Sequence, residues 1–208
     1  MKPDWTAPAT LLADAEWVRA RIGGAAKLYG CARPEVLGTI WWYSLSSVLV
    51  APAVEGLIAG APADPSLDAL EIDLLADGRF LGARSTRPLA GGLPELGAAF
   101  AAALGTAIAT IAAVTGARER ALGAIATDSI GNRLLWTSDP ERAITLAEPL
   151  VAAIGLGLPK PRFVRVGRTP AVRRASCCLI YEVGNPKCVS CPRQTPAERD
   201  ARLRAALG

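Results

Sequence analysis

The stretch RASCCLIYEVGNPKCVSC, residues 174–191, holds four of the five cysteines of this 208-residue chain. Cys177 and Cys178 are adjacent, and Cys188 and Cys191 enclose two residues. The chain has no histidine, so a metal bound in this stretch would depend on sulfur ligands. Four thiolates are the donor set of an iron–sulfur cluster or of a structural zinc ion. The choice between the two decides whether the chain is a redox protein or a metal-stapled binding module.

The spacing of the cysteines favours an iron–sulfur cluster. Neighbouring residues of an extended strand point to opposite faces, so Cys177 and Cys178 can converge only where the backbone is irregular. Paired ligands in zinc fingers and ribbons are usually separated by about two to four residues, whereas a two-iron cluster accepts ligands at two ends. Two alternatives stay open: a zinc staple held by the four cysteines, without redox activity, and a thiol redox switch in which Cys188 and Cys191 form a reversible disulfide.

The positive charge of the chain is concentrated around these cysteines. Residues 160–208 carry 11 Lys and Arg against 3 Asp and Glu, whereas residues 1–159 carry 12 against 16. A basic segment of this kind can bind nucleic acid, dock an acidic partner or compensate an anionic cluster. Aromatic residues are not interleaved with the arginines in the way that stacks bases, so we expect no nucleic-acid partner.

Two features bear on localisation. The N-terminal residues 1–5 lack the apolar core of a signal peptide, and clustered thiols without such a signal predict a cytoplasmic protein. Residues 96–117 include no charge and are long enough to span a bilayer. They are mostly alanine, glycine and threonine and lack aromatic anchors, so we expect a buried core helix there and no membrane span.

The residue pattern predicts an α+β fold: a mostly helical single domain with a β-hairpin or small antiparallel sheet. Alternation in Leu70–Leu74, an Asp77-Gly78 turn and a returning run predict a hairpin over residues 70–84. Short strands are expected over 163–166 and 178–183. Helices are expected over 10–28, 35–50, 95–114, 117–136, 139–154 and from a capping box at 195–198 to about residue 207. Residues 1–160 would form the helix-rich body, and residues 161–208 a C-terminal cysteine-rich, cluster-binding segment packed on the same domain.

The cysteine stretch resembles the C-terminal signature of the FhuF-like ferric-siderophore reductases. The resemblance is carried by residues 174–181, with their adjacent cysteine pair, followed by Cys188 and Cys191. Nine residues separate Cys178 from Cys188, one fewer than is usual in the family. Residues 126–133 are also similar to family sequence. The resemblance implies an α+β domain and a [2Fe–2S] cluster held by Cys177, Cys178, Cys188 and Cys191.

The same resemblance implies an oxidoreductase that reduces siderophore-bound Fe(III), of hydroxamate type, by one electron and releases Fe(II) in the cytoplasm. Hard oxygen donors hold Fe(III) far better than Fe(II), so one electron makes a tight complex labile. The sequence has no Gly-x-Gly-x-x-Gly or phosphate-loop motif, so we expect a separate electron donor such as a ferredoxin or a flavin- or NAD(P)H-dependent reductase. Arg173 and Arg174 are expected to raise the reduction potential by their charge.

Other residues are weaker candidates. Trp41, Trp42, Asp128 and Arg133 are candidates for a siderophore pocket, while core or surface roles remain open for each. Cys31 lies far from the other cysteines in sequence and is expected to be a small buried hydrophobic side chain rather than a ligand. We predict no catalytic acid or base, because electron transfer itself needs none.

Overall fold

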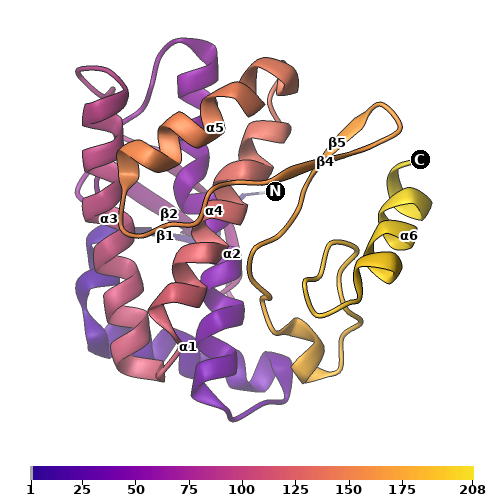
Figure 1. Cartoon of the computed structure of the whole chain (residues 1–208). Coiled ribbons are helices and arrows are strands. Elements are labelled where there is room, and N and C mark those ends of the chain that lie inside the picture. Colours follow the sequence, from indigo (N-terminus) through magenta and orange to yellow (C-terminus); the bar gives the residue numbers. More distant parts are fainter. Residues whose placement is uncertain (1) are drawn as a thin grey trace.

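The computed structural model describes residues 2–208, so Met1, which the signal-peptide and domain predictions include, lies outside the described residues. The helices before residue 155 gather into one body, and the C-terminal segment with its yellow terminal helix lies along one side of it (Figure 1). The mostly helical α+β fold class is confirmed. The elements follow in this order: β1 Trp5–Pro8, the 3-10 turn η1 Ala9–Ala13, α1 Ala15–Tyr29, α2 Pro34–Ala59, β2 Leu70–Leu74, β3 Phe80–Ser85, α3 Leu93–Thr115, α4 Glu119–Leu135, α5 Pro140–Ile154, β4 Phe163–Val166, β5 Thr169–Val172, the 3-10 turn η2 Ile180–Val183 and α6 Pro196–Leu207.

The predicted hairpin is confirmed, and it belongs to a three-stranded antiparallel sheet in the order β1-β2-β3. β2 pairs with β3 from Leu70 opposite Ser85 to Leu74 opposite Phe80. Alternate residues of β2 are buried, which is the burial that its apolar alternation predicts. β1 was not predicted, because four residues that end in proline carry too little strand signal.

The centre of the body is the packing of α2 against α4. Trp42 is fully buried there, and its indole nitrogen donates to the Leu122 carbonyl over 2.8 Å. The hydroxyls of Ser46 and Ser129 lie 2.7 Å apart across the same interface. The predicted end of α2 near residue 50 was wrong: the helix continues through Pro52 to Ala59, because buried residues on its later turns keep it packed in the core.

The long apolar helix α3 packs against α5 and buries one face. A Cβ atom added to Gly97 would lie 2.5 Å from the carbonyl of Ala153, so the two helices approach closely at this glycine. By length and composition, α2 and α3 could each cross a membrane, with 78% and 39% of their most apolar windows buried in the fold. Helices of this length and composition also form the cores of soluble proteins, and the core helix expected here is observed in the buried inner face of α3.

Local capping decides where several helices begin. The predicted start of the first helix at Thr10 was wrong: the Asp14 carboxylate accepts the amides of Glu16 (2.8 Å) and Trp17 (3.1 Å), so α1 begins after Asp14. The last helix confirms its prediction, because Thr195 and Glu198 form the reciprocal capping box at the start of α6.

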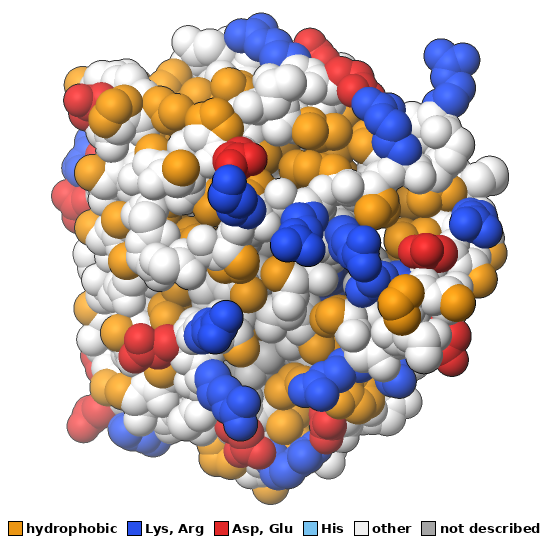
Figure 2. Space-filling model, in the orientation of Figure 1, with side chains coloured by type: hydrophobic (Ala, Val, Ile, Leu, Met, Phe, Trp, Pro, Cys, Tyr) orange, Lys and Arg blue, Asp and Glu red, His pale blue; other side chains and the backbone are white. Residues whose placement is uncertain are grey.

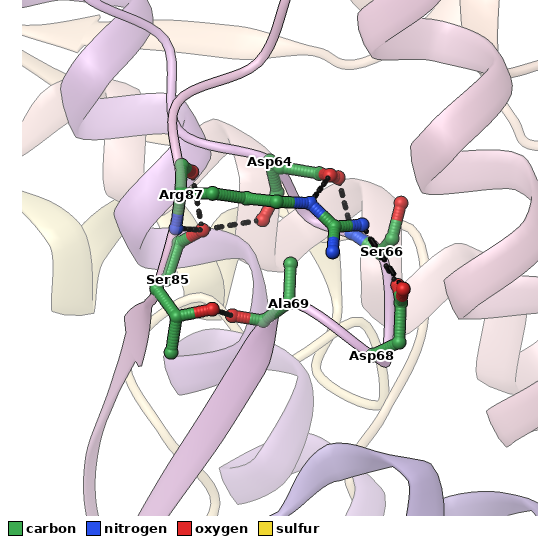
Figure 3. Close-up of polar contacts among 7 residues, drawn as sticks. Asp64, Ser66, Asp68, Ala69, Ser85 and Arg87 are labelled. Carbon is green, nitrogen blue, oxygen red and sulfur yellow. Dashed lines mark hydrogen bonds and ion pairs between the residues drawn. The ribbon is translucent and has the colours of Figure 1, made fainter.

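A polar cluster closes the connection between α2 and β2 (Figure 3). The Arg87 guanidinium pairs with Asp64 over 2.7 Å and with Asp68 over 3.0 Å. The Ser85 hydroxyl donates to the Asp64 carbonyl over 2.8 Å. These contacts fasten the loop that follows α2 to the end of β3, and they lie outside the cysteine segment.

Candidate metal centre

The cysteine segment has an irregular backbone. The β4–β5 hairpin leads into a bend at residues 175–176, and Leu179 then adopts a left-handed conformation with φ of 63°. The predicted strand over 178–183 was therefore wrong, because residues 180–183 form the 3-10 turn η2. The predicted strand over 163–166 is confirmed as β4. The bend and the left-handed residue supply the irregularity that an adjacent cysteine pair needs in order to present both sulfurs to one site.

The fold brings the two cysteine pairs together from the two ends of the segment. The sulfurs of Cys177 and Cys191 lie 3.6 Å apart. The Cys191 amide donates to the Cys188 carbonyl over 3.1 Å, which closes the Cys-x-x-Cys turn. Cys177, Cys178 and Cys191 are buried, and Cys188 is half-buried.

Arg174 lies between the other two sulfurs. One terminal nitrogen of its guanidinium is 3.8 Å from the sulfur of Cys178 and 3.3 Å from that of Cys188. The Arg174 side chain is only 5% exposed and stacks over the ring of Tyr43, with 4.6 Å from the guanidinium carbon to the ring centroid. A buried cation thus faces the sulfurs from the side of the helical body.

Asp128, on α4, holds the residues that precede the cysteines. Its carboxylate accepts the amides of Ala175 (2.9 Å) and Ser176 (3.2 Å) and lies 3.5 Å from the Arg174 guanidinium. Burial raises the pKa of Asp128 to about 6, although the two amides and the arginine act in the opposite direction. One carboxylate of the body therefore fixes both the backbone next to Cys177 and the position of the buried arginine.

The sulfurs titrate as unequal partners. The adjacent Cys177 thiol, together with the Arg174 charge, lowers the pKa of Cys178 despite burial. The adjacent Cys178 sulfur, together with burial, raises the pKa of Cys177. Burial works against the charged form of Arg174, but the neighbouring Tyr43 and cysteine sulfurs raise its pKa, so the guanidinium stays charged. The surroundings of Cys178, with a permanent cation beside it, therefore favour its charged form.

The four sulfurs lie in two pairs, Cys177 with Cys191 at 3.6 Å and Cys178 with Cys188 on either side of Arg174. Among residues 2–208, no three acidic or cysteine side chains are grouped closely enough to hold one metal ion. Two further nitrogens of Arg174, Nε and one terminal nitrogen, are buried without a hydrogen-bond partner. A buried cation with unsatisfied N–H groups is suited to an anionic group such as a thiolate-ligated cluster.

The structure separates the other candidates. Only Asp128 lies at the cysteine site. Trp42 is a core residue, and Trp41 packs edge-on against Trp17 and Phe80. Trp41 also lines a pocket of about 410 Å³ between α1, α2 and the β2–β3 turn, whose lining includes none of the cysteines.

Arg133 and Cys31 contact residues of the helical body. The Arg133 guanidinium donates to the Ser47 carbonyl over 2.7 Å and pairs with Glu55 over 3.3 Å. Cys31 packs against the core of the body and is half-buried rather than buried. The Arg133 contacts lie within the helical body. Cys31, by contrast, lies two residues before Arg33, which pairs with Glu182 of the cysteine segment over 2.8 Å.

Sequence reasoning grouped Tyr43 with Trp41 and Trp42 and did not connect it with the cysteines. It also missed a hollow of about 580 Å³ that borders Cys177 and is also lined by Arg118 and Arg193. Tyr43 sits in a run of apolar residues of α2 and gives no signal of its own. The role of Asp128 had a signal that could have been used: it is a carboxylate inside an otherwise buried stretch of α4, and buried charges are normally paired.

Comparisons with known proteins agree with the geometry. Residues 174–193 match the family model of the FhuF 2Fe-2S C-terminal domain, a range that includes Arg174 and all four clustered cysteines. No curated protein and no solved structure matches the chain. The resemblance predicted from the cysteine spacing is thereby confirmed, and the chain is FhuF-like through the 2Fe-2S C-terminal domain signature of its residues 174–193.

Proposed function

We propose that this protein is a cytoplasmic ferric-siderophore reductase, in which Cys177, Cys178, Cys188 and Cys191 hold a [2Fe–2S] cluster. The observation that carries the proposal is the coincidence of the FhuF 2Fe-2S match with the converging cysteines and the buried Arg174 beside them. When bound, such a cluster supplies electrons one at a time. The overall reaction takes one electron from a separate donor and converts chelated Fe(III) to Fe(II).

Some residues would hold the cluster, and others would adjust its reduction potential. Four thiolates act as ligands, and Asp128 fixes the backbone that carries Cys177 and Cys178. The buried guanidinium of Arg174 favours added negative charge at the sulfurs, which is the direction of reduction. Electron transfer itself needs no acid or base of the protein; the iron leaves as Fe(II), and the oxygen donors that it leaves take up protons from water.

Electrons are proposed to come from a separate protein. The sequence carries no nucleotide-binding motif, and a ferredoxin or a flavin- or NAD(P)H-dependent reductase would supply them one at a time. The excess of Lys and Arg in residues 160–208 favours an acidic donor. The resemblance implied a hydroxamate siderophore. Measuring the rate of reduction of ferric hydroxamates, catecholates and citrate identifies the class of chelate that the protein accepts.

The test is anaerobic purification followed by iron, labile-sulfide and zinc analysis and a reduction assay. We expect a coloured protein with equimolar iron and sulfide that reduces ferric chelates in the presence of a ferrous trap and a chemical reductant. Cys188→Ala should lose the cluster and at least about tenfold in rate, since a cluster ligand is removed.

Cys31→Ala is the matched control, because Cys31 packs against the core of the body and lies outside the matched residues 174–193. It should keep both the cluster and the rate. Stoichiometric zinc in fresh protein would support the zinc staple instead. Colourless, metal-free protein with a Cys188–Cys191 or Cys177–Cys191 disulfide would support the thiol switch; either result removes the proposed function.

A further inference from the structure

Three adjoining hollows form one groove along the segment that leads into the cysteines. Their volumes are about 580, 430 and 400 Å³. The first and second share Ser176, and Ala175 lines all three. The first also borders Cys177. We call this continuous depression the basic groove; each of its parts has the volume of a small-ligand pocket.

Almost all charged residues that line the basic groove are Lys or Arg. Glu35 is the one carboxylate among its described lining residues. Lys and Arg side chains follow the boundary between the helical body and the C-terminal segment (Figure 2). The lining cations are Arg118, Arg120, Lys160, Arg162, Arg173, Arg174 and Arg193.

Most of these cations lack a protein counter-charge. Within residues 2–208, Lys160 pairs with Glu148 and Arg174 with Asp128, whereas the other five groove arginines form no ion pair. Arg174 still keeps two buried nitrogens without a hydrogen-bond partner. Like charges gathered in one depression repel one another, and a bound anion relieves that repulsion.

The backbone adds to the positive field. α4 begins at Glu119, and no side chain caps its first turn. Ala117 and Ala121 of this helix start line the groove. Free amides at a helix start attract negative charge; the Glu119 side chain offsets part of this field and lines a different hollow.

We propose that the basic groove binds the ferric chelate through its negative charge, so that the substrate is an anionic complex of the catecholate or hydroxycarboxylate class rather than a neutral hydroxamate complex. This inference rests on the proposed function. Three catecholates leave a net negative complex around Fe(III), whereas three hydroxamates just neutralise the metal. The concave shape and the small-ligand volumes of its parts favour a small molecule over an acidic electron-donor protein.

Binding can be tested without electron transfer by using gallium(III) in place of iron. The cluster-loaded protein is titrated by calorimetry with two hexadentate gallium complexes, an anionic tris-catecholate and a neutral trihydroxamate, at low and high salt. We expect the anionic complex to bind at least about tenfold more tightly at low salt, because several exposed ion pairs add up. That preference should shrink at high salt through screening.

Matched variants locate the binding. Arg118→Gln combined with Arg193→Gln should lower the affinity for the anionic complex by roughly tenfold and leave that for the neutral complex unchanged. Arg142→Gln is the control, because Arg142 is exposed, lines none of the three hollows and forms no ion pair among the described residues. Circular dichroism confirms that each variant is folded.

The results separate this inference from the proposed function. Equal or tighter binding of the neutral complex would overturn the inference while leaving a reductase in place. An unchanged affinity of the double variant for the anionic complex would also overturn the inference. If that variant instead loses docking of an acidic ferredoxin, the groove binds the electron donor and the inference is overturned as well. Selective binding of the anionic gallium complex without any reduction of its ferric counterpart would support the inference and remove the proposed function.

Discussion

Arg173 and Arg174 are neighbours in sequence but lie in different environments. Arg174 is buried against the sulfurs of Cys178 and Cys188, whereas Arg173 is exposed. A charge in a buried, low-dielectric site acts more strongly than one that solvent screens. Arg174→Gln should therefore lower the reduction potential by at least the roughly 59 mV that corresponds to tenfold in a one-electron equilibrium. Protein-film voltammetry measures it.

Arg173→Gln provides the comparison for that measurement. Since its charge is screened, we expect a clearly smaller downward shift. An unchanged or higher potential in Arg174→Gln protein that retains its iron and sulfide would contradict the electrostatic role of Arg174.

Asp128 predicts a pH dependence of stability. Its pKa is raised from 3.8 to about 6 in the folded protein, so the folded state holds the proton more tightly than the unfolded state. The resulting stabilisation is complete below pH 3.8 and is lost as the pH rises through about 6. About two pKa units correspond to about 3 kcal/mol. Urea unfolding of the metal-free protein between these pH values measures the change.

Asp128→Asn removes the titrating group while keeping the side chain's shape. The difference in unfolding free energy between the wild type and this variant should fall with rising pH across the same window. A difference that stays constant, or that rises with pH, would show that the ion pair with Arg174 outweighs the burial of the carboxylate.

At the scale of single residues, the cluster ligands could be predicted from the sequence better than the residues that surround them. The four cysteines could be predicted because their chemistry and spacing are local. Arg174 could be predicted to act on the potential because it is three residues from Cys177. Its contact with Tyr43 joins residues more than a hundred positions apart, and its approach to Cys188 spans fourteen positions, so no local pattern encodes either contact.

The contact between α3 and α5 gives a prediction for two glycines of the same helix. A Cβ at Gly97 would meet the Ala153 backbone at 2.5 Å, whereas one at Gly105 would meet only the Leu156 side chain at 3.6 Å. Alanine in a helix interior gains about 0.5–1 kcal/mol over glycine. Overpacking against backbone costs about 1–3 kcal/mol, so the clash outweighs the gain at Gly97.

Gly97→Ala should therefore destabilise the protein, and Gly105→Ala should stabilise it slightly. Chemical denaturation of both variants measures the two free energies. Equal stabilisation by both would mean that α3 and α5 can move apart at no cost.

Elements with strong local signals were predicted well. The β2–β3 hairpin, α5 and α6 have turn or capping residues that mark their ends. The predicted strand over 178–183 was wrong because apolar alternation there is overridden by the left-handed Leu179 and by the anchoring of Ala175 and Ser176 to Asp128. The end of α2 was placed too early because burial in the core outweighs the proline at position 52.

The molecule as a whole consists of a large core and a thinly attached C-terminal segment. The main cluster of buried residues draws on α1 to α5 and the three-stranded sheet, while β4, β5 and α6 share a small cluster of Val166, Ala171 and Leu203. The long-range polar ties of the segment to the body include Asp128 with Arg174 and the exposed Arg33–Glu182 pair at 2.8 Å. Stability is therefore unevenly distributed along the chain.

Metal removal should affect the C-terminal segment more than the helical body. We expect chelation of iron to leave the helical circular dichroism signal nearly unchanged, because most helices belong to the body. Limited proteolysis followed by mass spectrometry should then show faster cleavage within residues 184–190, a loop that the bound centre would otherwise fix. Cooperative loss of all helical signal on chelation would instead mean that the centre stabilises the whole fold.

How the segment folds back onto the body could not be predicted from the sequence. The contact of β5 with α4 and that of η2 with α2 join parts of the chain that are distant in sequence. Such contacts depend on the complete packing arrangement. Charge composition alone indicated a basic region, and only the tertiary fold turns several of its arginines into the lining of one groove.

The guanidinium of Arg174 has a consequence for the protein before its iron arrives. It occupies the space between Cys178 and Cys188, while the sulfurs of Cys177 and Cys191 approach directly. In air, proximity therefore favours a Cys177–Cys191 disulfide in the empty polypeptide, while the raised pKa of Cys177 slows its formation. A maturation factor that delivers iron and sulfide would then find two of the four ligands oxidised. A cellular reductant that keeps Cys177 and Cys191 as thiols would prevent this.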